Sequence, residues 1–81
     1  MGSLLRLHAN VALLEDVPTR HFESGQQLLL HRGDTGTVVM IYDDSHYEVE
    51  FSDTSGRTYA LLPLAARQLL ALRDVPEHVG A

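Results

Sequence analysis

The clearest pattern along the chain is the alternation of apolar and polar residues over positions 47–51, the run Tyr-Glu-Val-Glu-Phe. Because successive side chains of a strand point to opposite faces of a sheet, this run predicts a strand that buries its aromatic and valine side chains and leaves Glu48 and Glu50 in water. The preceding run, 37–42, is also rich in strand-forming residues, and the polar Asp43-Asp44-Ser45-His46 suits a short hairpin loop. The sequence therefore predicts a central β-hairpin.

The first strand of this hairpin lacks a clean alternation. Positions 38–41, the run Val-Val-Met-Ile, are all apolar. Two explanations fit this pattern: both faces of the strand are covered, or a β-bulge switches the inward face.

Three shorter strands are predicted over 10–15, 57–62 and 69–72, with one helical turn over 64–68 before the last of them. Pro18 should stop the chain from continuing the first strand, and Pro63 should end the second, because proline cannot donate to a central ladder. Tyr59 and Leu61 should join the core face of their strand. A tight turn over 52–56 is expected to place Gly56 at positive φ.

Residues 17–32 form a long connection, and such a connection inside a small domain is usually functional or packed on itself. Its first half is polar and its second half is apolar, so we expect it to fold back as an irregular arm. Arg32 to Gly36 then turns into the central hairpin. Two glycines three apart do not make a phosphate loop here, because no Lys-Ser/Thr follows them and the next element is a strand.

The order is thus a strand, a long arm, three strands joined by tight turns, a helical turn and a short strand. We expect an all-β fold, a small five-stranded SH3-like barrel with a long first loop and a single helical turn before the last strand. The 81 residues form one domain, 1–81, with its core over about 7–72 and a frayed tail over 73–81.

Composition narrows the function classes. The formal charge is −5, and all six basic residues are scattered arginines, so the basic stripe that nucleic-acid binding needs is missing and we do not expect DNA or RNA as the main partner. The sequence has no transmembrane run or secretory signal. It contains no cysteine, which excludes disulfides and thiolate metal sites and fits a cytoplasmic protein.

No catalytic or metal-binding pattern stands out. The five histidines lack metal-ligand spacing, and no glycine-flanked nucleophile elbow is present. We therefore expect no enzyme activity, no metal and no cofactor. The three tyrosines could line a groove for proline-rich peptides, but such residues more often cap a barrel core with the hydroxyl outward.

Two stretches remain as candidate partner-binding surfaces. Five acidic residues concentrate negative charge around the central hairpin: Asp43, Asp44, Glu48, Glu50 and Asp53. This is either a solvated sheet face or an acidic surface that docks a basic partner, and the first four are the residues expected to make contact. On the arm, Phe22 and the run Leu28-Leu29-Leu30 exceed what one buried face can hide, which indicates a second packing layer or a partner surface. Phe22 and Leu29 are the arm residues expected to make contact.

The chain resembles a family of small bacterial proteins known as domain of unknown function 4926, on the runs 11–18, 33–42, 47–51 and 56–64, and the match covers roughly residues 7–72. The resemblance implies a stand-alone SH3-like barrel, often encoded beside another small gene in an arrangement like a toxin–antitoxin pair, and it carries over no catalytic residues. Shorter members lack the arm over 19–31. More distantly, the run Gly-Asp-Thr-Gly-Thr-Val-Val at 33–39 resembles the KOW segment of ribosomal and transcription-factor barrels.

The resulting hypothesis is a non-catalytic protein-interaction module, the antitoxin- or immunity-like member of a two-gene pair, whose protein partner is encoded by an adjacent gene. Two alternatives stay open: a KOW-like nucleic-acid or ribosome-associated protein, and an accessory barrel subunit of a larger enzyme. The sequence does not specify the oligomeric state.

Overall fold

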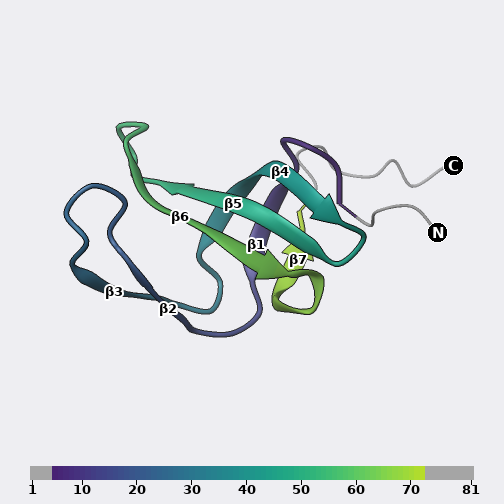
Figure 1. Cartoon of the computed structure of the whole chain (residues 1–81), viewed down its shortest axis with the longest axis horizontal. Helices are drawn as coiled ribbons and strands as arrows, with labels where there is room; N and C mark the ends of the chain where they lie inside the picture. Colours follow the sequence, from purple (N-terminus) through teal and green to yellow (C-terminus); the bar gives the residue numbers. More distant parts are fainter. Residues whose placement is uncertain (1–4, 73–81) are drawn as a thin grey trace, which may run out of the picture.

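A computed structural model of the chain describes residues 5–72, and these form an all-β fold (Figure 1). The strands are β1 (Asn10–Leu13), β2 (Val17–Arg20), β3 (Gln27–Leu30), β4 (Thr35–Asp43), β5 (His46–Ser52), β6 (Thr58–Ala65) and β7 (Leu69–Ala71), and a single 3₁₀ turn, η1 (Ala66–Gln68), precedes β7. The central hairpin is β4–β5, closed by a loop at Asp44 and Ser45. The predicted strands and the single helical turn are therefore present, with boundaries shifted by a few residues.

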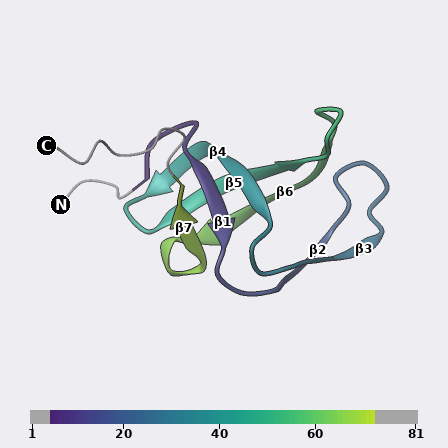
Figure 2. The ribbon, with the colours of Figure 1, turned by 180° about the vertical axis from the view of Figure 1, so that it is seen from behind.

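The strands belong to two antiparallel sheets. The larger has the order β6-β5-β4-β1-β7, and the smaller contains β2 and β3 alone. Figure 2 shows the large sheet from behind, with the β2–β3 pair projecting to one side of it. Among the described residues no sheet closes on itself, so the expected closed five-stranded barrel is not confirmed, and β6 and β7 are the two edges of the large sheet.

The arm over 17–32 is a regular β-hairpin, where an irregular arm was expected. Val17 pairs with Leu30 and Arg20 with Gln27, around a loop over 21–26. Pro18 lies inside β2 opposite Leu29. His21 N–H donates to Gln26 C=O at 2.7 Å, and hydrogen-bonded pairs alternate along the ladder. The backbone of Pro18 is therefore turned away from β3, where its missing N–H interrupts no bond.

Pro63 likewise lies inside β6, so the prediction that it ends this strand was wrong. Ala66 N–H donates to Ser45 C=O at 2.8 Å, which marks that pair as a hydrogen-bonded pair of the β5–β6 ladder. Such pairs alternate along antiparallel strands, so Pro63, opposite Glu48, has its backbone turned away from β5. A proline at an outer position of an edge strand interrupts no ladder bond.

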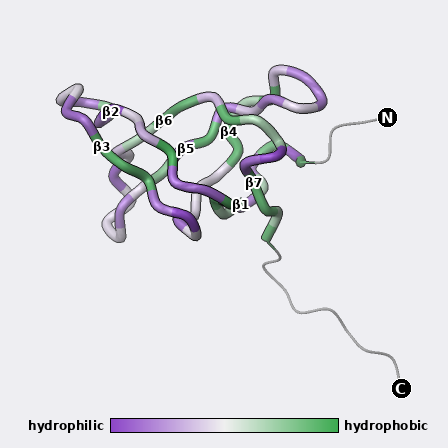
Figure 3. Tube along the Cα trace, turned by 90° about the horizontal axis from the view of Figure 1, so that it is seen from below, coloured by the Kyte–Doolittle hydropathy of each residue, from purple (hydrophilic) through white to green (hydrophobic). Residues whose placement is uncertain are grey.

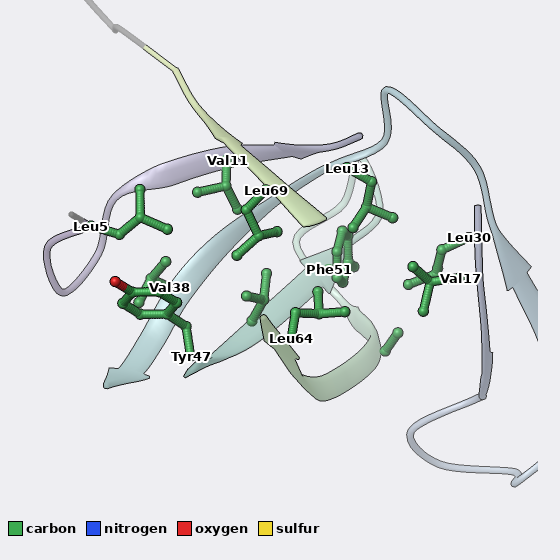
Figure 4. Packing of buried hydrophobic residues seen from close by; sticks show 12 residues of the cluster. Leu5, Val11, Leu13, Val17, Leu30, Val38, Tyr47, Phe51, Leu64 and Leu69 are labelled. Atoms are coloured by element: carbon green, nitrogen blue, oxygen red, sulfur yellow. The ribbon is translucent and has the colours of Figure 1, made fainter. Parts of the chain in front are cut away.

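One core gathers the buried side chains of both sheets. Figure 4 shows its members Leu5, Val11, Leu13, Val17, Leu30, Val38, Tyr47, Phe51, Leu64 and Leu69. Tyr47, Val49 and Phe51 are fully buried, as their alternation predicts. Val17 and Leu30 bring the arm into this core. Figure 3 shows the green, hydrophobic colour along part of β3.

A bulge explains the apolar run in β4. The register shifts between Val38 and Met40 and again between Ile41 and Asp43. Val38 is fully buried, whereas Met40 is 51% exposed and Ile41 is 38% exposed. Of the two explanations offered by the sequence, the bulge is the one observed, and it leaves apolar side chains at the surface.

On β6 the core-facing positions are Ala60 and Leu64, with Leu62 packed beside them. Leu61 is only half-buried and lies opposite Glu50, so its placement in the core was wrong. The register shift between Phe51 and Ser52 still lets Tyr59 reach the core, and the centroid of its ring lies 6.5 Å from that of Phe51.

The expected frayed tail, 73–81, lies outside the described residues.

Candidate interaction surfaces

The acidic residues of the central hairpin lie on the outer side of the large sheet. Glu48 sits on β5 between Met40 and Pro63, and Glu50 sits between Thr37 and Leu61. Asp43 pairs with His46, whose position alternates in phase with Glu48, so it belongs to the same side. We call Asp43, Asp44, Glu48 and Glu50 the acidic face, with Asp44 in the adjoining loop.

Both glutamates of this face accept a hydrogen bond from a neighbouring hydroxyl. Tyr42 Oη donates to Glu48 Oε1 at 2.8 Å, and Thr58 Oγ1 donates to Glu50 Oε2 at 2.7 Å. The pKa of Tyr42 is raised, first because its proton is held by the Glu48 carboxylate. Each carboxylate is therefore oriented by a neighbouring hydroxyl, while the residue is only partly buried.

The hairpin loop is organised by Asp43. Its Oδ1 accepts from Ser45 N–H at 2.8 Å and lies 2.9 Å from His46 Nδ1. The Ser45 backbone N–H, and then His46, lower the pKa of Asp43. The carbonyl of Asp44 accepts from Tyr47 Oη at 3.0 Å. Asp43 is thus chiefly a turn-forming residue, as the first interpretation of the acidic stretch holds, but it remains charged and exposed.

Apolar side chains surround the acidic face. Met40 and Tyr42 are each more than half exposed and flank Glu48 from β4. Leu70 on β7 and Leu72 just after it are also exposed. The sequence did not indicate Met40, Leu70 or Leu72 as contacts, and it indicated Tyr42 only for a groove that binds proline-rich peptides. The unbroken apolar run over 38–41 was the signal that could have found Met40.

A shallow hollow of about 390 Å³ lies where β1, β4 and β5 meet near Glu50. It is lined by Asn10, Thr35, Gly36, Thr37, Glu50, Ser52 and Leu72. Most of these side chains are polar and uncharged, and Glu50 is the one ionisable group among them. The hollow extends the acidic face toward β7 and gives a partner side chain room beside Glu50.

The arm presents the other two predicted contacts, on the smaller sheet. Phe22 is 56% exposed in the loop and Leu29 is 51% exposed on β3. Leu29 belongs to a second hollow of about 400 Å³, lined by Pro18, Thr19, Arg20, Gln27, Leu28 and Leu29. The structure therefore does not bring Phe22 and Leu29 onto the acidic face.

Polar contacts tie the arm to the end of the β5–β6 hairpin. Arg57 Nε donates to Glu23 Oε1 at 2.9 Å and Arg57 Nη2 donates to Glu23 Oε2 at 3.2 Å. This fork lowers the pKa of the Glu23 carboxyl, first through the hydrogen bond and then through the charge of Arg57. Phe22 N–H also donates to Tyr59 C=O at 2.8 Å, so the Phe22 backbone is held while its ring stays in water.

The remaining predictions concern chemistry. Among residues 5–72 no group of three or more histidine, aspartate or glutamate side chains is arranged to hold a metal ion. In the same part of the chain there is no helix of the length and apolarity needed to cross a membrane. His21 Nδ1 accepts from the backbone N–H of Glu23 and Ser24, so its observed role is to shape the arm loop.

Comparison with known proteins gives one result. The chain has no significant match among curated proteins or solved structures. A family model described as "Domain of unknown function (DUF4926)" matches residues 7–71, a span that contains β1 to β7 and includes both the acidic face and the arm. The protein therefore belongs to the domain of unknown function 4926 family.

Proposed function

We propose that this protein is a non-catalytic interaction module that docks a basic protein partner through the acidic face. The observation that carries the proposal is the arrangement around Glu48, which has Met40 on one side, Pro63 on the other, and a hydrogen bond from Tyr42. Exposed methionine and tyrosine beside fixed charges are typical of protein interfaces, whose centres are enriched in these residue types.

The electrostatics support a basic partner. The chain carries a formal charge of −5, and Glu48 and Glu50 add to the exposed Asp43 and Asp44 on one side of the sheet. Such a surface accelerates encounter with a positively charged protein and disfavours phosphate backbones. Because Glu48 and Glu50 lie on β5, paired on both sides, a partner meets them at fixed spacing, and little ordering entropy is lost on binding.

The fold and the cellular role follow as parts of the same proposal. The β4–β5–β6 meander, with β1 between β4 and β7, supports an SH3-like barrel left open along its edges. The protein would act in the cytoplasm as the antitoxin- or immunity-like member of a two-gene pair, with its partner encoded by the adjacent gene. The gene arrangement implied by family resemblance supports this assignment.

The test is affinity capture with the tagged full chain from its native cells, at moderate salt and with nuclease, read by mass spectrometry. The captured protein is then purified and titrated against three forms of the chain: the unmodified protein, Glu48→Lys/Glu50→Lys, and Glu48→Gln/Glu50→Gln. The glutamine pair is the matched control, since its side-chain carbonyls still accept from Tyr42 and Thr58 while the charge is removed.

We expect the lysine variant to abolish binding and the glutamine variant to weaken it, with a salt dependence lower than that of the unmodified chain. Unchanged affinity in the lysine variant would contradict the acidic-face proposal. Recovery of nucleic acid alone, or of ribosomal proteins lost on nuclease treatment, would favour the KOW-like alternative. Capture of an enzyme subunit whose activity depends on this chain would favour the accessory-subunit alternative.

A further inference from the structure

The described part of the chain has four edge strands, and three of them are protected against pairing with another chain. These are β6 and β7 in the large sheet and β2 in the arm, while β3 is the fourth. Exposed edges invite intermolecular β-pairing, and proteins block them with proline, with short strands or with covering groups. In this molecule such protection is present on β6, β7 and β2 and absent from β3.

On β6 the outer backbone groups on both sides of Leu61 are occupied or removed. Tyr59 C=O accepts from Phe22 N–H at 2.8 Å, Pro63 has no N–H, and Ala65 N–H donates to Gln68 Oε1 at 2.9 Å. β7 has three residues, and its outer Leu69 N–H is already donated to Ala66 C=O. On β2 the outer position opposite Leu29 is Pro18. A further strand therefore finds no continuous row of donors on these three edges.

β3 has no comparable block. His21 N–H donates to Gln26 C=O at 2.7 Å, which makes that pair hydrogen-bonded and, by alternation along the ladder, turns the backbone groups of Gln27 and Leu29 away from β2. Within residues 5–72, β3 pairs with β2 alone. The next outer N–H, on His31, is taken by Asp34 Oδ2 at 2.9 Å, so the open edge is centred on Leu29.

The sequence around Leu29 has the symmetry that a two-fold axis requires. Residues 27–31 read Gln-Leu-Leu-Leu-His, with apolar residues in the middle and a polar residue at each end. In an antiparallel pairing of two identical strands with Leu29 on the axis, each Leu29 lies opposite its own copy. Leu28 then lies opposite the partner subunit's Leu30, and Gln27 lies opposite the partner's His31. Each apolar residue thus lies opposite an apolar residue, and each polar residue lies opposite a polar one.

We propose that this edge binds a second copy of the chain, giving a two-fold dimer in which the two arms form one four-stranded sheet, β2-β3-β3-β2. The two Leu29 residues exchange reciprocal backbone hydrogen bonds on the axis, and each Gln27 N–H donates to the partner's His31 C=O. On the solvent face Pro18, Leu29 and their copies form one apolar row, because Leu29 pairs with Pro18 in each arm. Each Leu29 side chain thereby gains an apolar neighbour on the side that is open in the single chain.

The charge distribution permits this contact in a chain of net charge −5. Within the arm, Glu23 is paired with Arg57, and β3 itself carries no charged side chain. The acidic face lies on the other sheet. A two-stranded sheet is also marginal by itself, and extension to four strands stabilises it. The inference is independent of the proposed function, since it uses a different surface.

Cysteine cross-linking tests the geometry, because the native chain has no cysteine. In the proposed dimer the Leu29 Cα atoms are about 5.5 Å apart, so thiols at this position are within reach of a short bifunctional thiol reagent. Leu29→Cys should therefore be cross-linked to a dimer by such a reagent at least about tenfold faster than Leu70→Cys. Leu70 is the matched control, since it is exposed to the same 51% as Leu29.

Sedimentation equilibrium of the full chain over a range of concentrations tests the association itself. The unmodified chain should dimerise, and Leu29→Lys, which sets two like charges opposite each other, should weaken the dimer by about tenfold or more. Leu29→Pro removes the outer N–H without interrupting the β2–β3 ladder and should remain monomeric, whereas Leu29→Val should dimerise. Circular dichroism and thermal melting report whether each variant folds.

Glu48→Lys/Glu50→Lys should dimerise like the unmodified chain, which separates this inference from the acidic-face proposal. If Leu29→Pro does not fold, the lysine and cysteine variants decide. The proposal is overturned if the unmodified chain stays monomeric at all concentrations and Leu29→Cys cross-links no faster than Leu70→Cys. It is equally overturned if β3 proves to bind an extended segment of a different protein in place of a second copy.

Discussion

Gly36 on β4 lies directly against Phe51 on β5. A Cβ atom at position 36 would lie 3.0 Å from Phe51 Cε2 and 2.8 Å from both Val49 Cγ1 and the backbone oxygen of Glu50. Real Cβ atoms do not approach other atoms this closely, and the backbone oxygen cannot rotate away. The close approach of two strands over the core thus depends on a residue without a side chain.

Gly36→Ala is therefore expected to destabilise the fold by about 1–3 kcal/mol, the range for overpacking a well-packed core. The free energy of unfolding measured in urea should fall by this amount, with no change in the slope m. Thr35→Ala at the neighbouring exposed position serves as the control and should have little effect. A stability for Gly36→Ala equal to that of Thr35→Ala would contradict the packing argument.

The Glu23–Arg57 fork makes the docking of the arm dependent on pH. Arg57 lowers the pKa of the Glu23 carboxyl in the folded state. The stabilisation of the docked arm by this ion pair is therefore present above the unfolded-state pKa of Glu23, and it is lost as pH falls through the folded-state pKa. We expect the protection factor of the Phe22 N–H, its exchange rate relative to the intrinsic rate at the same pH, to fall below this range when measured by NMR. Glu23→Gln should show the lower protection factor already at neutral pH, and added salt should shift the unmodified chain in the same direction.

The Tyr42–Glu48 hydrogen bond can be tested by titration. Because the raised pKa of Tyr42 arises first from donation to the Glu48 carboxylate, replacing Glu48 with Gln should lower the Tyr42 pKa toward the ordinary tyrosine value. The direction of the pH dependence also follows. The stabilisation of the fold by the Tyr42–Glu48 hydrogen bond is present below the unfolded-state pKa of tyrosine, and it disappears as pH rises through the folded-state pKa. NMR of the Tyr42 ring measures the pKa. A pKa unmoved by Glu48→Gln would show that this bond is not formed in solution.

Pro63 is expected to protect the β6 edge more than it stabilises β6. Pro63→Thr restores an outward N–H at a position that faces away from β5, so the fold should be retained and self-association through β6 should increase. Light scattering at high concentration measures this, and Ala65→Thr is the control because Gln68 already caps its N–H. Equal scattering from the two variants would assign the protection of this edge to some other group.

Sequence reasoning recovered the elements whose pattern is local. The alternation over 47–51 fixes which side chains of β5 face the core, and Gly56 takes positive φ, +85°, as its turn requires. What it missed depends on neighbours in space. Pro63 was interpreted as the end of its strand because nothing local shows that this strand is an edge. β1 does end before Pro18, as predicted, but the separate strand that contains Pro18 was missed. Leu61 was assigned to the core because it alternates with Tyr59, and this failed because the register shift at Phe51 and Ser52 changes which residues of β6 face inward.

The candidate contact residues also divide into those placed correctly by local alternation and those whose position depends on neighbours in space. Glu48 and Glu50 were placed on one outer face by alternation, and the structure confirms that placement. The separation of Phe22 and Leu29 from the acidic face could not be foreseen, because it depends on the arm forming a sheet of its own. Met40 and Tyr42 came beside Glu48 through the bulge in β4, whose position the sequence left open.

The two ends of the arm meet where it leaves the large sheet. Val17 pairs with Leu30, and Arg32 N–H donates to Asp16 Oδ1 at 2.8 Å, so the chain returns to the point from which it departed. The segment between them can therefore change in length without moving either β1 or β4, provided that Val17 and Leu30 keep their places in the core. This hairpin is thus a natural insertion point, where a foreign peptide grafted into the 21–26 loop would be displayed on an intact domain.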